Sequence, residues 1–403
     1  MRSAKPTSTA LLLAAIALVA LNLRPFITSI GPLAVDIAAH TGLQRQGVAL
    51  LTLVPMLLMG IFAFAGPALQ ARIGGRLAIL AALAALALGS LLRMVAGSGW
   101  QVIGTAALLG LGAAIIQAVL PGIIKRQFPR HVGAAMGLYS AMLMGGGALG
   151  AQLSPLIAAA SGSWQAGLAW TALPVLLALA LAARCLPHDA ANRLAHISVS
   201  QLLRRPRVWL LMACFGLVNG GYSTVVAWLA PFYREHGWSA VASGGLLATL
   251  ALFQAAAALL LPMLAGRSED RRPWLWLTLA MQATGFAALA LWPEAAPFAW
   301  AMLLGMGLGG CFALSLITAL DHLHDPAQAG ALSALMQGGG FLIAALPPGI
   351  VAALRDAMGD FSAGWLLHLG CVGLVAGLYG RVAPAGYALA MRVERRAQPL
   401  ETQ

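Results

Sequence analysis

The chain has 403 residues, of which 60% are hydrophobic and 9% are charged, and its mean hydropathy is +0.85. Ordinary soluble domains carry roughly 25% charged residues, so this composition excludes that class and indicates an integral membrane protein. The formal net charge of +12 would suit a nucleic-acid-binding protein, and that class has to be tested against the distribution of the charges.

Apolar stretches long enough to cross a hydrocarbon core of roughly 30 Å as a helix recur along the whole chain. Short breaks that contain charged residues, glycine or proline separate them. The first stretch follows Arg2 and Lys5 but is too long for a secretory signal, so we expect it to be retained. We predict an all-α protein with twelve transmembrane helices, at residues 10–35, 47–69, 77–96, 101–124, 132–160, 164–184, 208–232, 240–265, 273–292, 297–320, 328–354 and 361–381.

The first predicted span contains Arg24, the one charged side chain that the pattern places clearly within a span, and Pro25 directly after it. An arginine at the middle of a span costs about 2.5 to 3.5 kcal/mol on insertion scales. Proline cannot donate to the helix and disfavours a helical conformation at the preceding residue, so we expect a kink at this position. Irregular backbone at membrane depth is tolerated where it lines protein or a watery cavity.

No acidic residue is expected within a span, so the sequence offers Arg24 no buried carboxylate; Asp36, at the outer end of the first span, is a distant exception. The planar guanidinium fork matches a carboxylate, nitro, nitrate or cyanate group. We therefore expect the substrate to supply the missing negative charge or electron-rich group. Snorkelling of Arg24 to the interface, or a structural hydrogen bond, is the alternative.

Other polar residues fall within predicted spans and could complete a binding cavity. Thr28 lies one turn after Arg24, and Asn219 lies 195 residues after it, at the separation of an internal repeat described below. Each of these side chains could equally join two helices through a hydrogen bond. The candidates are Asn22, Thr28, Gln117, Tyr139, Asn219, Tyr222, Gln254 and Gln337. His368, alone among apolar neighbours, is more typical of a packed core residue than of a proton carrier.

The longest polar connection divides the chain into six spans and six spans. We expect a first bundle at residues 1–185, a cytoplasmic linker at 186–207 and a second bundle with a short cytoplasmic tail at 208–403. "LQARIGGR" from Leu69 is matched 195 residues later by "LAGRSEDRR" from Leu264, and Gly42 and Gly237 keep the same separation. Such a repeat favours a transporter, because two similar bundles can rock about a site at their interface.

Lysine and arginine concentrate in the segments on one side of the predicted spans. This bias predicts that both termini are cytoplasmic in a bacterial-type inner membrane, and it explains the basic charge without nucleic acid, which we do not expect to bind. The predicted outer segments hold Arg45, Arg93, Arg234 and Arg355.

These features resemble the major facilitator superfamily, whose inner loop usually reads G-x-L-a-D-R-x-G-R-R. Arg72, Gly74 and Arg76 match that motif, Arg267 falls in its second copy, and Ala71 replaces the Asp. "LNLRPFITSIGPL", "GLYSAMLMGGGALGA" and "SALMQGGGFLIAALPPG" are similar to segments of the cyanate and nitroimidazole transporter group. The resemblance implies two pseudo-symmetric six-helix bundles, alternating access, and a cavity lined by the first, fourth, seventh and tenth spans.

We therefore expect a secondary transporter of a small anionic or nitro-bearing solute, such as a cyanate-like anion or a nitroimidazole-type compound, with Arg24 as its main contact. The protein is expected to be monomeric and to need no cofactor. A membrane-embedded enzyme would need a nucleophile, acid–base pair or metal cluster at membrane depth, and the spans offer no catalytic or metal-binding set. A multidrug-type efflux pump for neutral or cationic compounds, or a sensor on the same fold, stays open, as do the direction and the coupling ion.

Overall fold

The computed structural model describes residues 9–187 and 199–391. The residues before Thr9, most of the expected linker and most of the expected C-terminal tail lie outside the described residues. The described residues form helices joined by short turns. The first half comprises α1 (Thr9–Leu21), α2 (Pro25–Thr28), α3 (Ile30–Thr41), α4 (Arg45–Ala63), α5 (Gly66–Ile73), α6 (Gly75–Leu92), α7 (Gly99–Gln127), α8 (Val132–Ser161), α9 (Trp164–Ala169) and α10 (Ala172–Cys185).

The second half repeats this succession of long helices and short breaks. It comprises α11 (Val199–Leu203), α12 (Pro206–Glu235), α13 (Ala240–Ala265), α14 (Arg272–Leu291), α15 (Pro297–Asp321), α16 (Pro326–Ala344), α17 (Pro347–Met358), α18 (Ser362–Tyr379), the short 3₁₀-helix η2 (Pro384–Gly386) and α19 (Tyr387–Met391). Gly42 and Gly237, which occupy equivalent positions in the predicted repeat, both adopt positive φ, at 70° and 85°, a conformation that favours glycine.

Eleven helical segments of the described chain are long and apolar enough to span a membrane, and a bent pair makes up to twelve. The bent pair is Gly47–Ala63 and Gly66–Ile73, which meet at 62°. The second predicted span is therefore two helices rather than one straight helix. These spans make the chain an integral membrane protein of the all-α class, as the sequence predicts.

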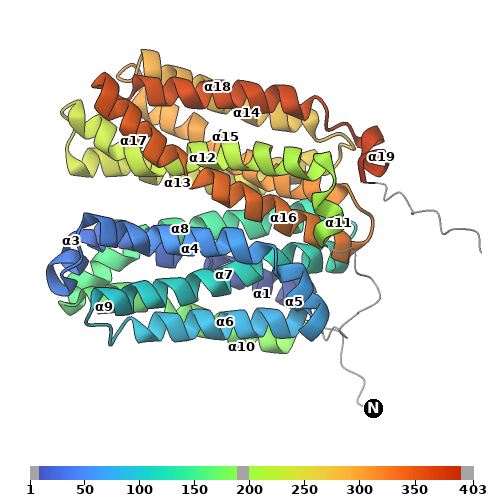
Figure 1. Cartoon of the computed structure of the whole chain (residues 1–403), viewed down its shortest axis with the longest axis horizontal. Helices are drawn as coiled ribbons and strands as arrows, with labels where there is room; N and C mark the ends of the chain where they lie inside the picture. The colour runs from blue at the N-terminus through green and yellow to red at the C-terminus, as the bar shows by residue number, and fades with distance from the viewer. Residues whose placement is uncertain (1–8, 188–198, 392–403) are drawn as a thin grey trace, which may run out of the picture.

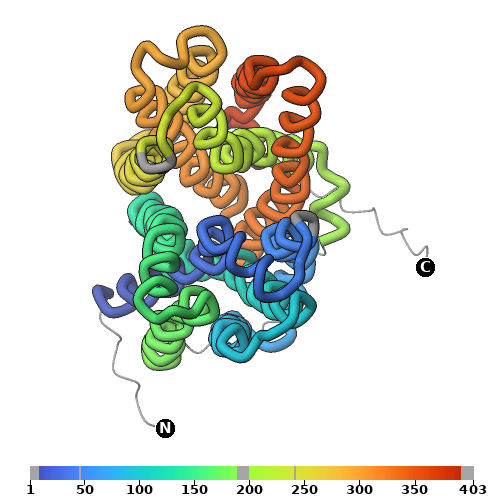
Figure 2. Tube along the Cα trace, turned by 90° about the vertical axis from the view of Figure 1, so that its left-hand side faces the viewer, coloured from blue at the N-terminus to red at the C-terminus, as the bar shows by residue number. Residues whose placement is uncertain are grey.

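The two halves lie side by side with their long helices running in the same general direction (Figure 1). Figure 1 shows α5, α11 and α19 at one end of the molecule, here called the linker end, and α3, α9 and α17 at the opposite end, here called the far end. Figure 2, viewed from the far end, shows the first half below the second. The halves contact each other mainly through α8 with α13 and through α16 with α4 and α7.

The apolar core crosses the boundary between the halves. Met136 and Leu143 of α8 belong to the same buried cluster as Phe312 of α15 and Met336 of α16. A second buried cluster fills the interior of the second half. Because the interface is packed like a core, polar groups within it are few, and each one that lies there needs a reason.

Candidate functional site

The helix break in the first span is formed by Arg24 and Pro25. Helix α1 ends at Leu21, and α2 begins at Pro25, which occupies a first-turn position where its missing N–H costs nothing. Arg24 caps α2 with φ −123° and ψ −27°, and its carbonyl accepts hydrogen bonds from the N–H groups of Ile27 and Thr28. The break therefore presents Arg24 at a bend rather than on a continuous helix.

Glycines of α8 make room for this bend. A Cβ atom at Gly146 would lie 1.9 Å from the carbonyl oxygen of Leu21, and one at Gly150 would lie 2.6 Å from Cα of Pro25. Such distances are far inside van der Waals contact, so the backbone of the break can approach α8 only because these residues have no side chain. The glycines of α8 therefore allow the close approach that positions Arg24; α16 has a similar run of three glycines, residues 338–340.

The Arg24 side chain is buried at the boundary between the halves. It is 9% exposed, and its Cζ lies 5.2 Å from the ring centroid of Tyr222 on α12 of the other half. Its Nε is buried without a hydrogen-bond partner in the structure, and no ion pair joins Arg24 to any carboxylate of the described residues. The guanidinium therefore has an aromatic neighbour, and residues 9–187 and 199–391 provide no counter-charge for it.

Several other buried polar atoms near this boundary also lack partners within the described chain. Both amide atoms of Gln117, the hydroxyls of Tyr139 and Ser140, and Oε1 of Gln337 are buried and unpaired. Gln337 Nε2 donates to the backbone carbonyl of Gln117 at 3.2 Å, which joins α16 to α7 across the boundary. Tyr139 lies within electrostatic range of Arg24. Unpaired buried polar atoms are rare in folded proteins, so those near this boundary are candidates for contacts with a ligand.

The side chains of three other predicted substrate contacts form hydrogen bonds with backbone carbonyls of the protein. Asn22 Nδ2 donates to Leu18 at 2.7 Å and to Pro174 at 3.2 Å, and Asn219 Nδ2 donates to Phe215 at 2.8 Å, all at backbone carbonyls. Thr28 Oγ1 donates to the carbonyl of Gly147 at 2.7 Å and ties α2 to α8.

Gln254 and His368 both lie within the second half. Gln254 is buried on α13, where Gly305 and Gly309 of α15 pack against its backbone. His368 is buried on α18; its Nε2 lies 2.8 Å from the Thr224 hydroxyl, and its ring stacks on Phe286. The structure thus gives both residues neighbours within their own bundle.

Arg93 is a buried charged side chain that the sequence analysis did not expect, at the end of a span rather than within it, because the apolar helix ends at Leu92. Arg93, which the sequence analysis placed in an outer segment, follows α6 and is 0% exposed. Its Nη1 donates to the carbonyl of Phe26 at 3.2 Å, while Nε and Nη2 have no partner in the structure. A charge near the end of an apolar stretch resembles an interfacial residue, and hydropathy does not reveal that the last turn faces the core.

At the linker end, only some residues of the predicted inner-loop motif make contacts with other helices. Gly74 has φ 82°, which requires glycine between α5 and α6, and Arg76 donates to the carbonyl of Ala183 at the end of α10. The side chains of Arg72 and Arg267 are exposed.

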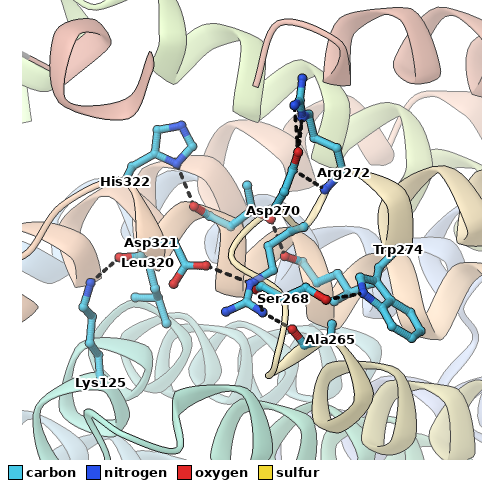
Figure 3. Close-up of polar contacts among 12 residues, drawn as sticks. Lys125, Ala265, Ser268, Asp270, Arg272, Trp274, Leu320, Asp321 and His322 are labelled. Atoms are coloured by element: carbon cyan, nitrogen blue, oxygen red, sulfur yellow. Dashed lines mark hydrogen bonds and ion pairs between the residues drawn. The ribbon is translucent and has the colours of Figure 1, made fainter. Parts of the chain in front are cut away.

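A neighbour of Arg267 makes the stronger contacts. Arg271 Nε pairs with Asp321 at 3.0 Å, and Arg271 Nη1 donates to the carbonyls of Ala265 and Ser268. Lys125 of α7 donates to the carbonyls of Leu320 and Leu323 at the end of α15, so it joins the two halves (Figure 3). Sequence reasoning missed Lys125, Arg271 and Ser140; the one available signal was that Lys125 and Leu320 are 195 residues apart, the separation of the repeat.

Comparison with known proteins agrees with this architecture. The chain is 42% identical over 364 residues to the cyanate transport protein CynX of Escherichia coli, covering 90% of this chain and 94% of that protein. It is 30% identical over 378 residues to a 2-nitroimidazole transporter of the same organism, covering 92% and 95%. The solved structure of the proton:xylose symporter XylE superposes with a TM-score of 0.76 at 13% identity, covering 92% of this chain and 95% of that one.

The fucose:proton symporter FucP of Escherichia coli superposes with a TM-score of 0.71 at 13% identity, covering 93% of this chain and 98% of that one. At this identity the two symporters establish the fold alone. The profile of the Major Facilitator Superfamily matches residues 10–348. This chain therefore belongs to the Major Facilitator Superfamily and is a membrane transporter rather than an enzyme.

Proposed function

We propose that this transporter moves a small anionic or nitro-bearing solute, a cyanate-like anion or a nitroimidazole-type compound, by alternating access, with Arg24 as the main substrate contact. The observation that carries the proposal is a guanidinium buried between the halves without a carboxylate partner in the described chain. Relatives named for cyanate and 2-nitroimidazole transport support the same two solute classes. Two bundles of one chain supply both sides of the site, so a monomer suffices.

The chemistry of the site favours a planar, electron-rich ligand. Arg24 can donate through its fork to two oxygens or to one anionic atom, and the Tyr222 ring covers one face of the guanidinium. The unpaired amide of Gln117 and hydroxyl of Tyr139 add donors and acceptors for the remaining edges of a small ligand. A cation would meet Arg24 without compensation, which disfavours the alternative of a pump for cationic compounds.

Alternating access has a physical basis in contacts at the linker end. Lys125 bonds across the halves there, and a Cβ atom at Gly122 of α7 would lie 3.2 Å from Cα of Gly330 on α16. We propose that these contacts close the linker end in this state and separate in the opposite state. With both termini in the cytoplasm of an inner-membrane protein, the linker end is the cytoplasmic side.

The proposal is tested with purified protein and with proteoliposomes. Binding of cyanate and of 2-nitroimidazole is measured for the wild type, Arg24→Ala and Arg24→Lys. Arg355→Ala is the control, because Arg355 is a half-exposed arginine at the far end that pairs with Glu235. We expect Arg24→Ala to lose binding and Arg24→Lys to weaken it, because the ammonium keeps the charge but not the fork. Undiminished binding in Arg24→Ala would overturn the proposal, and binding without counterflow in proteoliposomes would indicate a sensor.

A further inference from the structure

Arg93 is a second buried cation, and the proposed substrate site does not account for it. It follows α6 towards the far end of the first half and has no exposed surface. Its Nη1 donates to the Phe26 carbonyl at 3.2 Å, and its Nε and Nη2 are buried without partners. No ion pair joins it to a carboxylate of the described residues, and Asp36, the acidic residue of α3, is exposed.

A lone buried guanidinium is expensive to maintain. Taking the charge out of water costs free energy that one hydrogen bond to a carbonyl does not repay, and a charge without a partner is among the most destabilising features of a protein interior. An apolar residue of similar length would fill the same space without that cost. In membrane proteins, ionisable groups kept in such positions usually serve the transported species.

The hydrogen bond from Arg93 connects α6 to the helix break that carries Arg24. Phe26 lies in α2, two residues after Arg24, so the two arginines are linked through a short backbone segment. The opposite side of this segment is held by α8, where Thr28 bonds to Gly147, and by a chain in which Trp170 donates to Ser154 and Ser154 donates to Ser29. Arg93 therefore contacts α2 on the side that faces α6, and its side chain is charged, whereas the contacts on the opposite side are made by neutral side chains.

We propose that Arg93 determines specificity through its charge: the hydrogen bond to the Phe26 carbonyl fixes the guanidinium behind α2, and this second positive charge makes the site select anions over neutral solutes of similar size. The inference rests on the proposed function. For the size of the effect we assume a separation on the order of 10 Å between Arg93 and the bound anion; at an effective dielectric constant of about 20, this attraction changes the affinity roughly tenfold. A neutral ligand gains nothing from that charge.

The test compares two probes in matched variants. The probes are cyanate, an anion, and 1-methyl-2-nitroimidazole, which has no acidic N–H and stays neutral. The variants are Arg93→Met, which removes charge and donor, Arg93→Gln, which keeps a donor without charge, and Arg93→Lys, which keeps the charge. Arg355→Met removes the same unit of charge from a half-exposed position at the far end and serves as the control. Affinity for each probe and the temperature of thermal unfolding are measured.

We expect Arg93→Met and Arg93→Gln to bind cyanate about tenfold more weakly, to bind the neutral probe within about twofold of the wild type, and to unfold at no lower temperature. Arg93→Lys should recover most of the cyanate affinity, and Arg355→Met should change neither. If both probes weaken equally, or if the unfolding temperature falls while cyanate binding stays constant, Arg93 is purely structural and the inference is wrong.

Should Arg93→Met fail to fold, the comparison of Arg93→Gln with Arg93→Lys carries the same test. Arg24→Ala reports on the proposed function separately, because it must lose both probes if Arg24 is the main contact. A site that depends on Arg24 but treats the two probes alike in every Arg93 variant would therefore overturn this inference and leave the proposed function in place.

Discussion

At the residue scale, the orientation of Arg24 depends on an aromatic ring from the other half. The Tyr222 ring lies 5.2 Å from the Arg24 Cζ in a partly buried setting, where a cation–π contact contributes about 0.5 to 2 kcal/mol. We expect Tyr222→Leu to weaken anion binding by roughly 2- to 30-fold, because the guanidinium loses the surface that holds it flat. Equilibrium binding of cyanate to purified protein measures the effect.

Tyr222→Phe separates the ring from its hydroxyl. It keeps the aromatic face, so it should bind within about twofold of the wild type. Equal weakening in the Phe and Leu variants would mean that the hydroxyl contacts the substrate and that the cation–π contact is unimportant. Unchanged binding in both would remove Tyr222 from the site.

His322, at the linker end just beyond α15, makes the stability of the protein depend on pH. Its Nδ1 lies 2.6 Å from the Thr318 carbonyl, its ring stacks 3.8 Å from that of Tyr387, and Nε2 is buried without a partner. The pKa of His322 is lowered from 6.5 to about 4, mainly by burial; the hydrogen bond to the Thr318 carbonyl opposes the shift, and the charges of Arg207 and Lys125 add to it. The folded state thus holds the neutral imidazole.

The sign of the pH dependence follows from proton binding. Between pH 6.5 and about 4 the unfolded chain binds a proton at His322 that the folded chain does not, so stability should fall as pH falls through this window and be constant above it, by up to about 3 kcal/mol. Thermal unfolding in detergent between pH 8 and 4 measures this. His322→Phe keeps a ring against Tyr387, and its slope should be smaller; an identical slope would contradict the assignment.

At the element scale, the packing of α8 on the helix break should be sensitive to one methyl group. A Cβ atom at Gly150 would lie 2.6 Å from the Pro25 backbone and 2.5 Å from the Thr28 hydroxyl, so Gly150→Ala must push α2 away. We expect a loss of about 1 to 3 kcal/mol of stability and weaker anion binding, because Arg24 moves with α2. Thermal unfolding and cyanate binding measure the two effects.

Gly145 on the same helix provides the control. A Cβ atom there would have nothing within 4 Å, so Gly145→Ala should be neutral or slightly stabilising, since alanine is the better helix former. If Gly150→Ala and Gly145→Ala behaved alike, the close approach of α2 to α8 would not be the reason for the glycine at position 150.

The bounds of a helix can be predicted well from the sequence where the helix is one continuous apolar stretch. The predicted spans at 101–124 and 297–320 correspond to α7 (Gly99–Gln127) and α15 (Pro297–Asp321), which are continuous apolar helices. The fold class and the superfamily followed from the number of such stretches and from their repeat. The bend between α4 and α5 also has a mark in the sequence: Pro67, in the first turn of α5, lacks the N–H that would bond to the carbonyl of Ala63, the last residue of α4. The sequence does not reveal the size of the bend.

In the candidate site, too, some residues could be predicted from the sequence and others could not. Arg24 and Pro25 stand out in an apolar stretch, because a charge and a helix breaker have a cost that sequence alone reveals. The burial of Arg93 and the contact of Lys125 with α15 depend on which face of a helix meets another helix. Such contacts are long-range properties of the packed molecule, and one sequence carries little trace of them.

At the scale of the whole molecule, the two halves meet at the linker end through residues that the internal repeat relates. Lys125 at the end of α7 bonds to Leu320 at the end of α15, and the two are separated by the repeat length. Partial negative charge at the end of α15 favours the ammonium, and the carboxylates of Asp321 and Asp325 add to it. The Arg271–Asp321 ion pair links the same helix end to the turn after α13.

If the proposed alternating access is correct and Lys125 helps to close the linker end, removing its charge should shift the molecule towards the opposite state. Hydrogen bonds that involve a charged group contribute about 1.5 to 3 kcal/mol each, so Lys125→Met should change the ratio of the two states by at least roughly tenfold. Spin labels on the exposed positions Val35 of α3 and Met358 of α17, in a variant without native cysteines, report the far-end separation.

The distance distribution between the two labels distinguishes the outcomes. Lys125→Met should populate a shorter far-end distance, because under the proposed alternating access the far end closes as the linker end opens. Lys125→Arg keeps a charged donor at the end of α15, so its distribution should stay near that of the wild type. If Lys125→Met left the distribution unchanged, the contacts of Gly122 with α16 would be sufficient to hold the linker end closed, and Lys125 would have no part in setting the state.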